Sequence, residues 1–218
     1  MSGSPNRDEA HALQCRYLPD RAGKARQKLL RKEMLRRLCA MSAIAGALDD
    51  LPRAERLKRF PPFLGVKHAL KRTLHFDADI SRAADQTGVQ KSAVQAVVFR
   101  ETLGYGAEDL LLDRIRVNAS RGLCQIRPST AMEADKALGI VPPVYKAYAR
   151  QLNHARVSIL SCAKILKAEA VKIHAQPSEM TDEELLTVFK RYNGGAHYAR
   201  CVLLYCRAFE MAEKKPAE

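Results

Sequence analysis

The stretch KSAVQAVVFRETL, residues 91–103, has the apolar spacing of a buried helix. At 100° per residue, Val94, Val97 and Val98 form one stripe. Glu101 follows them by seven, four and three residues, so it falls in the middle of that apolar face. Such a carboxylate loses hydration, which favours its neutral form and raises its pKa. A carboxyl group that stays protonated near neutral pH can act as a general acid, whereas the structural alternative is an internal ion pair with an arginine.

Helical periodicity dominates the rest of the chain. Thr181 and Glu184 have the spacing of a capping box, and Gly194 supplies a C-terminal stop. Pro128 suits the first turn of another helix. Only residues 121–126 could form a short extended segment, so we expect a mainly α fold, α+β at most. Besides residues 91–103, helices are expected at 66–75, 79–87, 128–138, 143–173, 181–192 and 196–213.

The length and composition indicate one globular domain with an appendage. The chain has 218 residues, of which 47% are hydrophobic and 28% charged, so it can bury a sizeable core. Its formal net charge of +13 is concentrated near the N-terminus, where residues 1–60 hold 14 Lys or Arg against 7 Asp or Glu. This excess fits a polyanionic partner, and nucleic acid, an anionic membrane surface and an acidic cell-wall polymer all qualify.

The N-terminal part leaves two interpretations open. Residues 38–48 (LCAMSAIAGAL) carry no charge, follow a basic stretch and contain small residues, as a secretory signal peptide does. The same stretch also fits a packed helix. Prolines and a glycine in residues 51–65 indicate a linker. We therefore divide the chain into a basic N-terminal extension, 1–64, which is a tail, a leader or a packed helix, and a domain, 65–218. A leader would place the protein in the cell envelope, and otherwise it would be cytoplasmic.

The sequence does not indicate a membrane span or a metal site. No run of 18 apolar residues occurs, so no integral membrane segment is expected. The six cysteines form no C-x-x-C pair, and most should be buried thiols. The histidines lack the i, i+4 spacing of metal ligands, so we expect no metal and no other cofactor. Nothing in the sequence indicates an oligomeric state.

Three short motifs and a later tyrosine follow one another along the chain. They are Glu101-Thr102, residues 122–131 (GLCQIRPSTA), Tyr192-Asn193 and Tyr198. Over roughly residues 80–206, this set resembles the lysozyme-like superfamily, and most closely the bacterial lytic transglycosylases that cut peptidoglycan. In that family a helix ends in Glu-Ser, a Gly-Leu-Met-Gln-Ile-x-Pro-x-Thr-Ala segment follows, and a Tyr-Asn motif closes a later helix.

The resemblance implies a lysozyme-like helical domain that cleaves the β-1,4 bond between MurNAc and GlcNAc in peptidoglycan glycan strands. Glu101 would protonate the glycosidic oxygen and then, as a carboxylate, accept the proton of the muramic acid 6-hydroxyl. The product would be an anhydro sugar, formed without water. Tyr198 would lie near the Glu101 carboxylate. The residues implied to bind the sugar strand are Thr102, Ser120, Gly122, Leu123, Gln125, Tyr192, Asn193 and Tyr198.

The chain also departs from the family pattern. Thr102 replaces a serine, Cys124 replaces a methionine, and Arg127 replaces an apolar residue. A hydrolytic lysozyme on the same fold is therefore an alternative, and Asp113 is the best candidate for the second carboxylate that hydrolysis would use. A wall-binding protein with an impaired cleft is a further alternative.

Residues 79–98 also fit a helix-turn-helix with its turn at Gly88-Val89. Given the positive net charge, DNA binding is the competing hypothesis, and nucleic acid is expected as a partner only in that case. A helix-turn-helix gives no reason for Glu101 on the buried face of the second helix, or for the later motifs. The residues that would face the groove and the phosphates are Gln90, Lys91, Ser92, Gln95 and Arg100.

Overall fold

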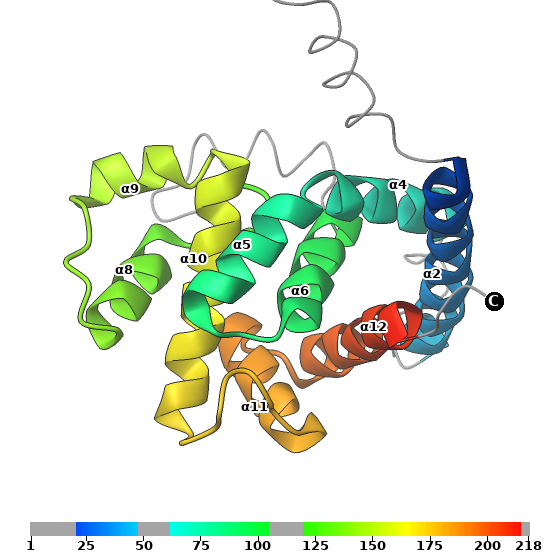
Figure 1. Cartoon of the computed structure of the whole chain (residues 1–218). Helices are drawn as coiled ribbons and strands as arrows, with labels where there is room; N and C mark the ends of the chain where they lie inside the picture. The colour runs from blue at the N-terminus through cyan, green and yellow to red at the C-terminus, as the bar shows by residue number, and fades with distance from the viewer. Residues whose placement is uncertain (1–20, 48–61, 105–119, 215–218) are drawn as a thin grey trace, which may run out of the picture.

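The computed structural model describes residues 21–47, 62–104 and 120–214, and its regular elements there are helices (Figure 1). The expected mainly α class is confirmed. An isolated antiparallel bridge between Arg121 and Ile126 is the remnant of the expected extended segment. The helices are α2 (Arg21–Ala47), α4 (Pro62–His75), α5 (Asp77–Thr87), α6 (Lys91–Gly104), α8 (Pro128–Ala137), α9 (Tyr145–Gln151), α10 (Ala155–Lys172), α11 (Asp182–Asn193) and α12 (Ala196–Lys214).

Helix α6 is the centre of the core. Every side chain from residue 92 to residue 99 is buried, because α4, α5, α10 and α12 pack around the helix. Phe99 makes edge-to-face contacts with Tyr205 and Phe209 of α12, at ring-centroid distances of 4.8 and 5.9 Å. A helix that is enclosed on all sides is the most constrained element of a domain. The last turn of α6, which carries Glu101, directly follows this enclosed part of the helix.

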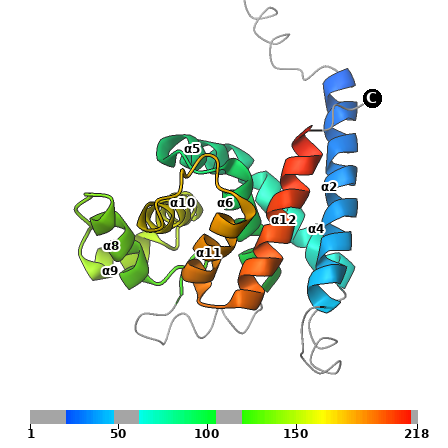
Figure 2. The ribbon, with the colours of Figure 1, turned by 90° about the horizontal axis from the view of Figure 1, so that it is seen from below.

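Helix α2 lies alongside α12 and also contacts α4 (Figure 2). Met34 and Leu38 are buried and join the same hydrophobic core as α6. Residues 38–47 of the uncharged N-terminal stretch belong to this helix. Most of the expected linker, residues 51–65, lies outside the described residues, which resume at Pro62. No helix in the described ranges is both long enough and apolar enough to cross a membrane.

The single helix expected at 143–173 is wrong, because the structure forms two helices there. Helix α9 ends at Gln151 and α10 begins at Ala155. Leu152, between them, is fully buried, and its carbonyl oxygen lies against Gly122, where an added Cβ atom would be only 1.9 Å away. The break thus lies where the backbone contacts a segment thirty residues earlier, and hydrophobic periodicity does not reveal such a contact.

The expected helix ends are present. Thr181 caps α11: its backbone N–H donates to Glu184 at 2.7 Å, and its hydroxyl accepts from the Glu184 N–H at 3.4 Å. Gly194 ends the helix in the left-handed conformation, with φ +86°. Pro128 occupies the first turn of α8. Of these ends, Gly194 lies in the short connection between α11 and α12, which the candidate site uses.

Candidate catalytic site at the end of α6

Glu101 lies in the last turn of α6, partly buried, and contacts α12. The Tyr198 hydroxyl donates a hydrogen bond of 2.6 Å to Glu101 Oε1, across 97 residues of sequence. Tyr198 itself is buried in the first turn of α12. A short hydrogen bond from a phenol to a carboxyl group fixes the direction of that group and favours its ionised form. The remaining accessible surface of Glu101 leaves it open to a ligand.

The pKa of Glu101 lies close to neutral pH. Burial raises its pKa from an ordinary 4.5 to about 7, although the Tyr198 hydrogen bond and the positive charge of Arg100 both act to lower it. Near pH 7 the protonated and ionised forms are therefore both populated. Arg100 does not form an ion pair with Glu101 in the described part of the chain, and its guanidinium lies 5.8 Å from the centre of the Tyr198 ring instead. The arginine-pair alternative for Glu101 is thus not realised among these residues.

Residues 121–126 form a tight turn that is built for close approach to α10. Arg121 and Ile126 exchange two backbone hydrogen bonds, of 2.9 and 3.0 Å. Gly122 has φ +70° and no room for a side chain, so only glycine fits there. The Cys124 N–H donates to Ser158 Oγ of α10 at 3.0 Å. Backbone groups of this turn are therefore held in fixed positions.

Gln125 supports the same turn from within. Its side-chain Nε2 donates to the Gly122 carbonyl at 3.0 Å, and its own backbone has φ +48°. A non-glycine residue in this conformation is strained, and such strain persists where surrounding contacts enforce it. Gln125 is partly exposed, so it combines a structural role with access to solvent.

Tyr192, at the end of α11, connects the turn at residues 121–126 to the Tyr198–Glu101 pair. Its hydroxyl donates to the Cys124 carbonyl at 2.8 Å, and its ring stacks on Tyr198 at a centroid distance of 6.3 Å and an angle of 11°. Burial raises the pKa of both phenols well above the usual value, and the Glu101 carboxylate raises it further. Both tyrosines thus remain hydrogen-bond donors at neutral pH. One continuous cluster connects Glu101 to the turn at residues 121–126.

The sequence-predicted residues do not all reach this cluster in the same way. The structure brings together Glu101, Gly122, Gln125, Tyr192 and Tyr198. Leu123 is buried, whereas Ser120 is partly exposed and Asn193 exposed. Asp113 lies outside the described residues.

Thr102 directs its side chain into the protein. It is 6% exposed, and its hydroxyl is buried without a hydrogen-bond partner in the described ranges. This burial does not support the expected contact with the glycan, which stays a prediction. Its position next to Glu101 on a helix whose neighbouring side chains are enclosed turns it inward.

Sequence reasoning missed the support that α10 provides. Ser158 receives the Cys124 N–H, and the Cys162 thiol lies beside that of Cys124. Burial raises the pKa of the Cys124 thiol well above its usual value, and Cys162 adds to this effect. Both thiols are free and buried, so they act as small apolar side chains under the turn. An inward serine whose partner is a backbone N–H leaves no signature in the sequence.

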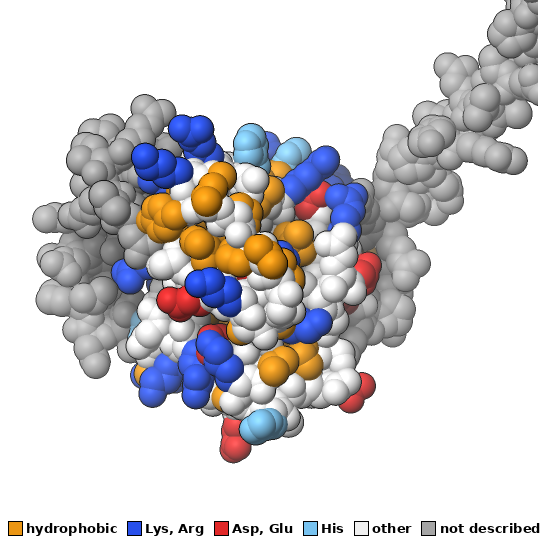
Figure 3. Space-filling view, turned by 90° about the vertical axis from the view of Figure 1, so that its left-hand side faces the viewer, with side chains coloured by type: hydrophobic (Ala, Val, Ile, Leu, Met, Phe, Trp, Pro, Cys, Tyr) orange, Lys and Arg blue, Asp and Glu red, His pale blue; other side chains and the backbone are white. Residues whose placement is uncertain are grey.

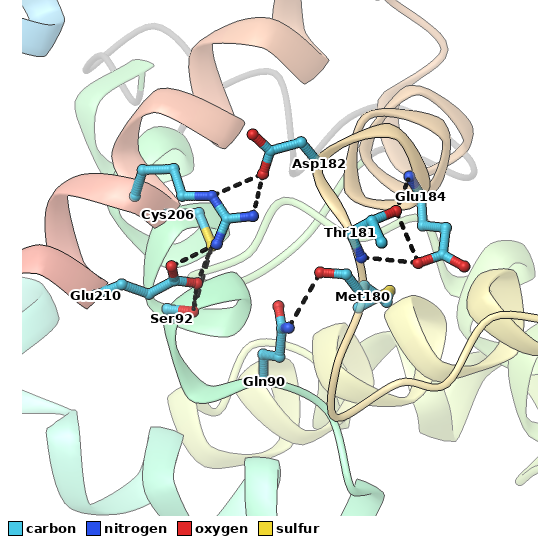
Figure 4. A network of polar contacts seen from close by, with 9 residues as sticks. Gln90, Ser92, Met180, Thr181, Asp182, Glu184, Cys206 and Glu210 are labelled. Atoms are coloured by element: carbon cyan, nitrogen blue, oxygen red, sulfur yellow. Dashed lines mark hydrogen bonds and ion pairs between the residues drawn. The ribbon is translucent and has the colours of Figure 1, made fainter.

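The burial of two residues weighs against the competing helix-turn-helix. Its two helices and turn form, but Gln95 is 1% exposed and Ser92 is 5% exposed. Ser92 donates to Glu210 of α12 at 2.9 Å and accepts from the Cys206 thiol at 3.3 Å (Figure 4). A recognition helix must present a row of side chains to the groove of DNA. The expectation that Ser92 and Gln95 face a nucleic acid is therefore wrong.

Two other residues of that segment are also engaged. Gln90 donates to the Met180 carbonyl at 3.3 Å (Figure 4). Lys91 pairs with Asp77 at 3.0 Å and with Glu213 at 3.5 Å. These contacts join the start of α6 to Met180, to the first turn of α5 and to the end of α12.

Among the described residues, no group of three or more His, Cys, Asp or Glu side chains is arranged to hold a metal ion. No family model, no curated protein and no solved structure matches this chain. The chemical interpretation of the site therefore depends on the geometry and on the sequence motifs.

Proposed function

We propose that this protein is a peptidoglycan lytic transglycosylase with a lysozyme-like domain, which cleaves the β-1,4 bond between MurNAc and GlcNAc with Glu101 as its single catalytic carboxyl group. The observation that supports the proposal best is the partly buried Glu101, whose pKa lies at about 7 and whose carboxyl group is oriented by Tyr198. A pKa near the working pH suits a group that must both give and take a proton.

The reaction needs two proton transfers at one carboxyl group. Protonated Glu101 donates to the glycosidic oxygen while the bond from that oxygen to C1 of MurNAc breaks. The resulting carboxylate then accepts the proton of the 6-hydroxyl, whose oxygen bonds to C1 and closes the anhydro ring. Glu101 ends protonated as it began, and no water is consumed.

Tyr198 is a positioning residue in this scheme. Its hydrogen bond favours the ionised form of Glu101 and so limits the rise in pKa that burial causes. The stacked Tyr192 ties the turn at residues 121–126 to the same cluster. We infer that the exposed parts of this cluster, with Gln125 and Asn193, bind the sugar strand. This substrate would place the protein in the cell envelope.

Hydrolysis on the same fold would give different products from this reaction. A two-carboxylate hydrolase would add water and leave reducing ends. In the described residues, the charged and hydroxyl groups that influence Glu101 are Arg100 and Tyr198, neither of which is a carboxylate.

The decisive experiment is digestion of purified sacculi followed by mass spectrometry of the released fragments. The wild-type chain should release anhydro-muropeptides, and Glu101→Gln should abolish that release while keeping the circular dichroism spectrum. Glu133→Gln, which alters an exposed carboxyl group on α8, is the matched control and should retain full activity. Fragments with reducing ends would instead assign hydrolysis, and clearing of walls by the Glu101→Gln variant would refute any role for this carboxyl group.

A further inference from the structure

The loop between α8 and α9 exposes an unusual group of apolar side chains. Val141 is 90% exposed, Val144 77% and Ile140 40%, and they account for half of the six large apolar side chains that are strongly exposed in the described residues. Figure 3, which views the molecule from the side of α8 and α9, shows hydrophobic side chains gathered on this face with Lys and Arg around them. Pro142 and Pro143 lie between the two valines and restrict the backbone of the loop.

The segment that contains this loop carries positive charges only. Residues 136–168 contain no Asp or Glu. The cations of this segment are Lys136, Lys146, Arg150, Arg156, Lys164 and Lys167. Arg156 is paired with Asp79, and Lys164 with Asp135. Lys136, Lys146 and Arg150 are exposed, and none of them has an ion pair in the part of the chain that the structure describes.

These cations border the apolar tip. Lys136 lies in the last turn of α8, just before the loop, and Lys146 lies in the first turn of α9, just after it. Lys146 and Arg150 are four residues apart, so they share one face of α9. The exposed valines are thus framed by positive charge on both sides.

We propose that the α8–α9 loop surface, defined as Ile140, Val141 and Val144 with Lys136, Lys146 and Arg150, docks on an anionic lipid bilayer. The valines insert at the level of the headgroups, and the three cations bind lipid phosphates. Apolar insertion combined with positive charge is the requirement for interfacial binding to anionic lipids. This inference is independent of the function proposed for Glu101.

The exposed valines of the α8–α9 loop surface favour one of the possible anionic partners over the others. A hydrated acidic polymer or a nucleic acid would use the cations but gain nothing from the valines, since their burial requires an apolar phase. A protein partner would have to supply a complementary packed surface for side chains that project almost wholly into solvent. A fluid bilayer needs no matching pocket. The combination therefore favours lipid.

The proposal is tested by flotation of the full chain with vesicles of phosphatidylcholine alone or with phosphatidylglycerol added. The wild type should bind only the anionic vesicles. Lys146→Glu with Arg150→Glu should weaken that binding at least about twentyfold, since each basic residue near the surface contributes about fivefold. Val141→Ser with Val144→Ser should weaken it at least about tenfold. The matched controls, Val171→Ser at a half-exposed site on α10 and Lys71→Glu on α4, should bind as the wild type does.

A fluorescent reporter distinguishes insertion from charge attraction. The chain has no tryptophan, so Val144→Trp introduces a single indole at the tip and Val171→Trp introduces one elsewhere. Anionic vesicles should shift the emission of the first to shorter wavelength and leave the second unchanged. The proposal is overturned if the wild type ignores anionic vesicles, if the serine substitutions leave binding intact, or if the two emission spectra respond alike.

Discussion

Glu101→Gln should stabilise the folded chain at alkaline pH and leave its stability nearly unchanged at acid pH. Burial holds the pKa of Glu101 at about 7 in the folded protein, against an ordinary 4.5. Between these two values the folded chain binds more protons at this site than the unfolded chain, so the free energy of unfolding falls as pH rises. The penalty is absent below pH 4.5 and complete above pH 7.

The size of the effect follows from the difference between the two pKa values. Each pKa unit corresponds to about 1.4 kcal/mol, so ionised Glu101 should cost the folded state about 3 kcal/mol above about pH 7. Glutamine has nearly the same shape, does not ionise, and keeps an oxygen that can accept the Tyr198 hydrogen bond. The variant should therefore escape the penalty.

Urea unfolding, followed by circular dichroism at several values from about pH 4 to about pH 8, measures this difference. The stability gap between the Glu101→Gln variant and the wild type should grow with pH and level off above about pH 7. Glu133→Gln is the control, because that exposed carboxyl group lies on the surface of α8. A gap that is independent of pH, or that is largest in acid, would refute the claim that Glu101 is desolvated.

Two further predictions concern the supports of the site. Tyr198→Phe removes the hydrogen bond that lowers the Glu101 pKa, so the pKa should rise further and the alkaline limb of sacculus digestion should move up by about one pH unit, whereas Tyr148→Phe should not move it. Gly122→Ala should destabilise the fold by more than about 2 kcal/mol in urea unfolding, since its Cβ atom would overlap the Leu152 carbonyl. Gly139→Ala, with a similar φ of +73° but no atom within 4 Å, should lose only about 1 kcal/mol.

Periodicity predicted most of the helices, although α6 is buried on every side from residue 92 to residue 99 and not on one face. The helix expected at 91–103 forms as Lys91–Gly104, and the one expected at 128–138 forms as Pro128–Ala137. The inward direction of Glu101 followed from its spacing to three valines, and that side chain is partly buried. Local chemistry likewise predicted the cap of α11, because Thr181 and Glu184 are only three residues apart.

Contacts between distant segments were beyond the reach of such patterns. The break before α10 lies where Gly122 approaches the Leu152 carbonyl, and the sequence around either residue gives no sign of this contact. Ser158 and Cys162 support the turn from α10, but in sequence they look like ordinary members of a helix. Thr102 was expected from its motif to bind the sugar strand, and the structure buries its side chain.

The geometry of the site depends on a single short connection. Glu101 belongs to the buried α6, whereas the turn at residues 121–126 is held by α10, so the two halves of the site are positioned by different helices. Tyr192 hydrogen-bonds to the turn at residues 121–126, and Tyr198 hydrogen-bonds to Glu101. Both tyrosines flank the connection between α11 and α12. Their rings stack on each other, so the two hydrogen bonds meet at one pair of side chains. Gly194, in the left-handed conformation, lies in the connection between these two tyrosines.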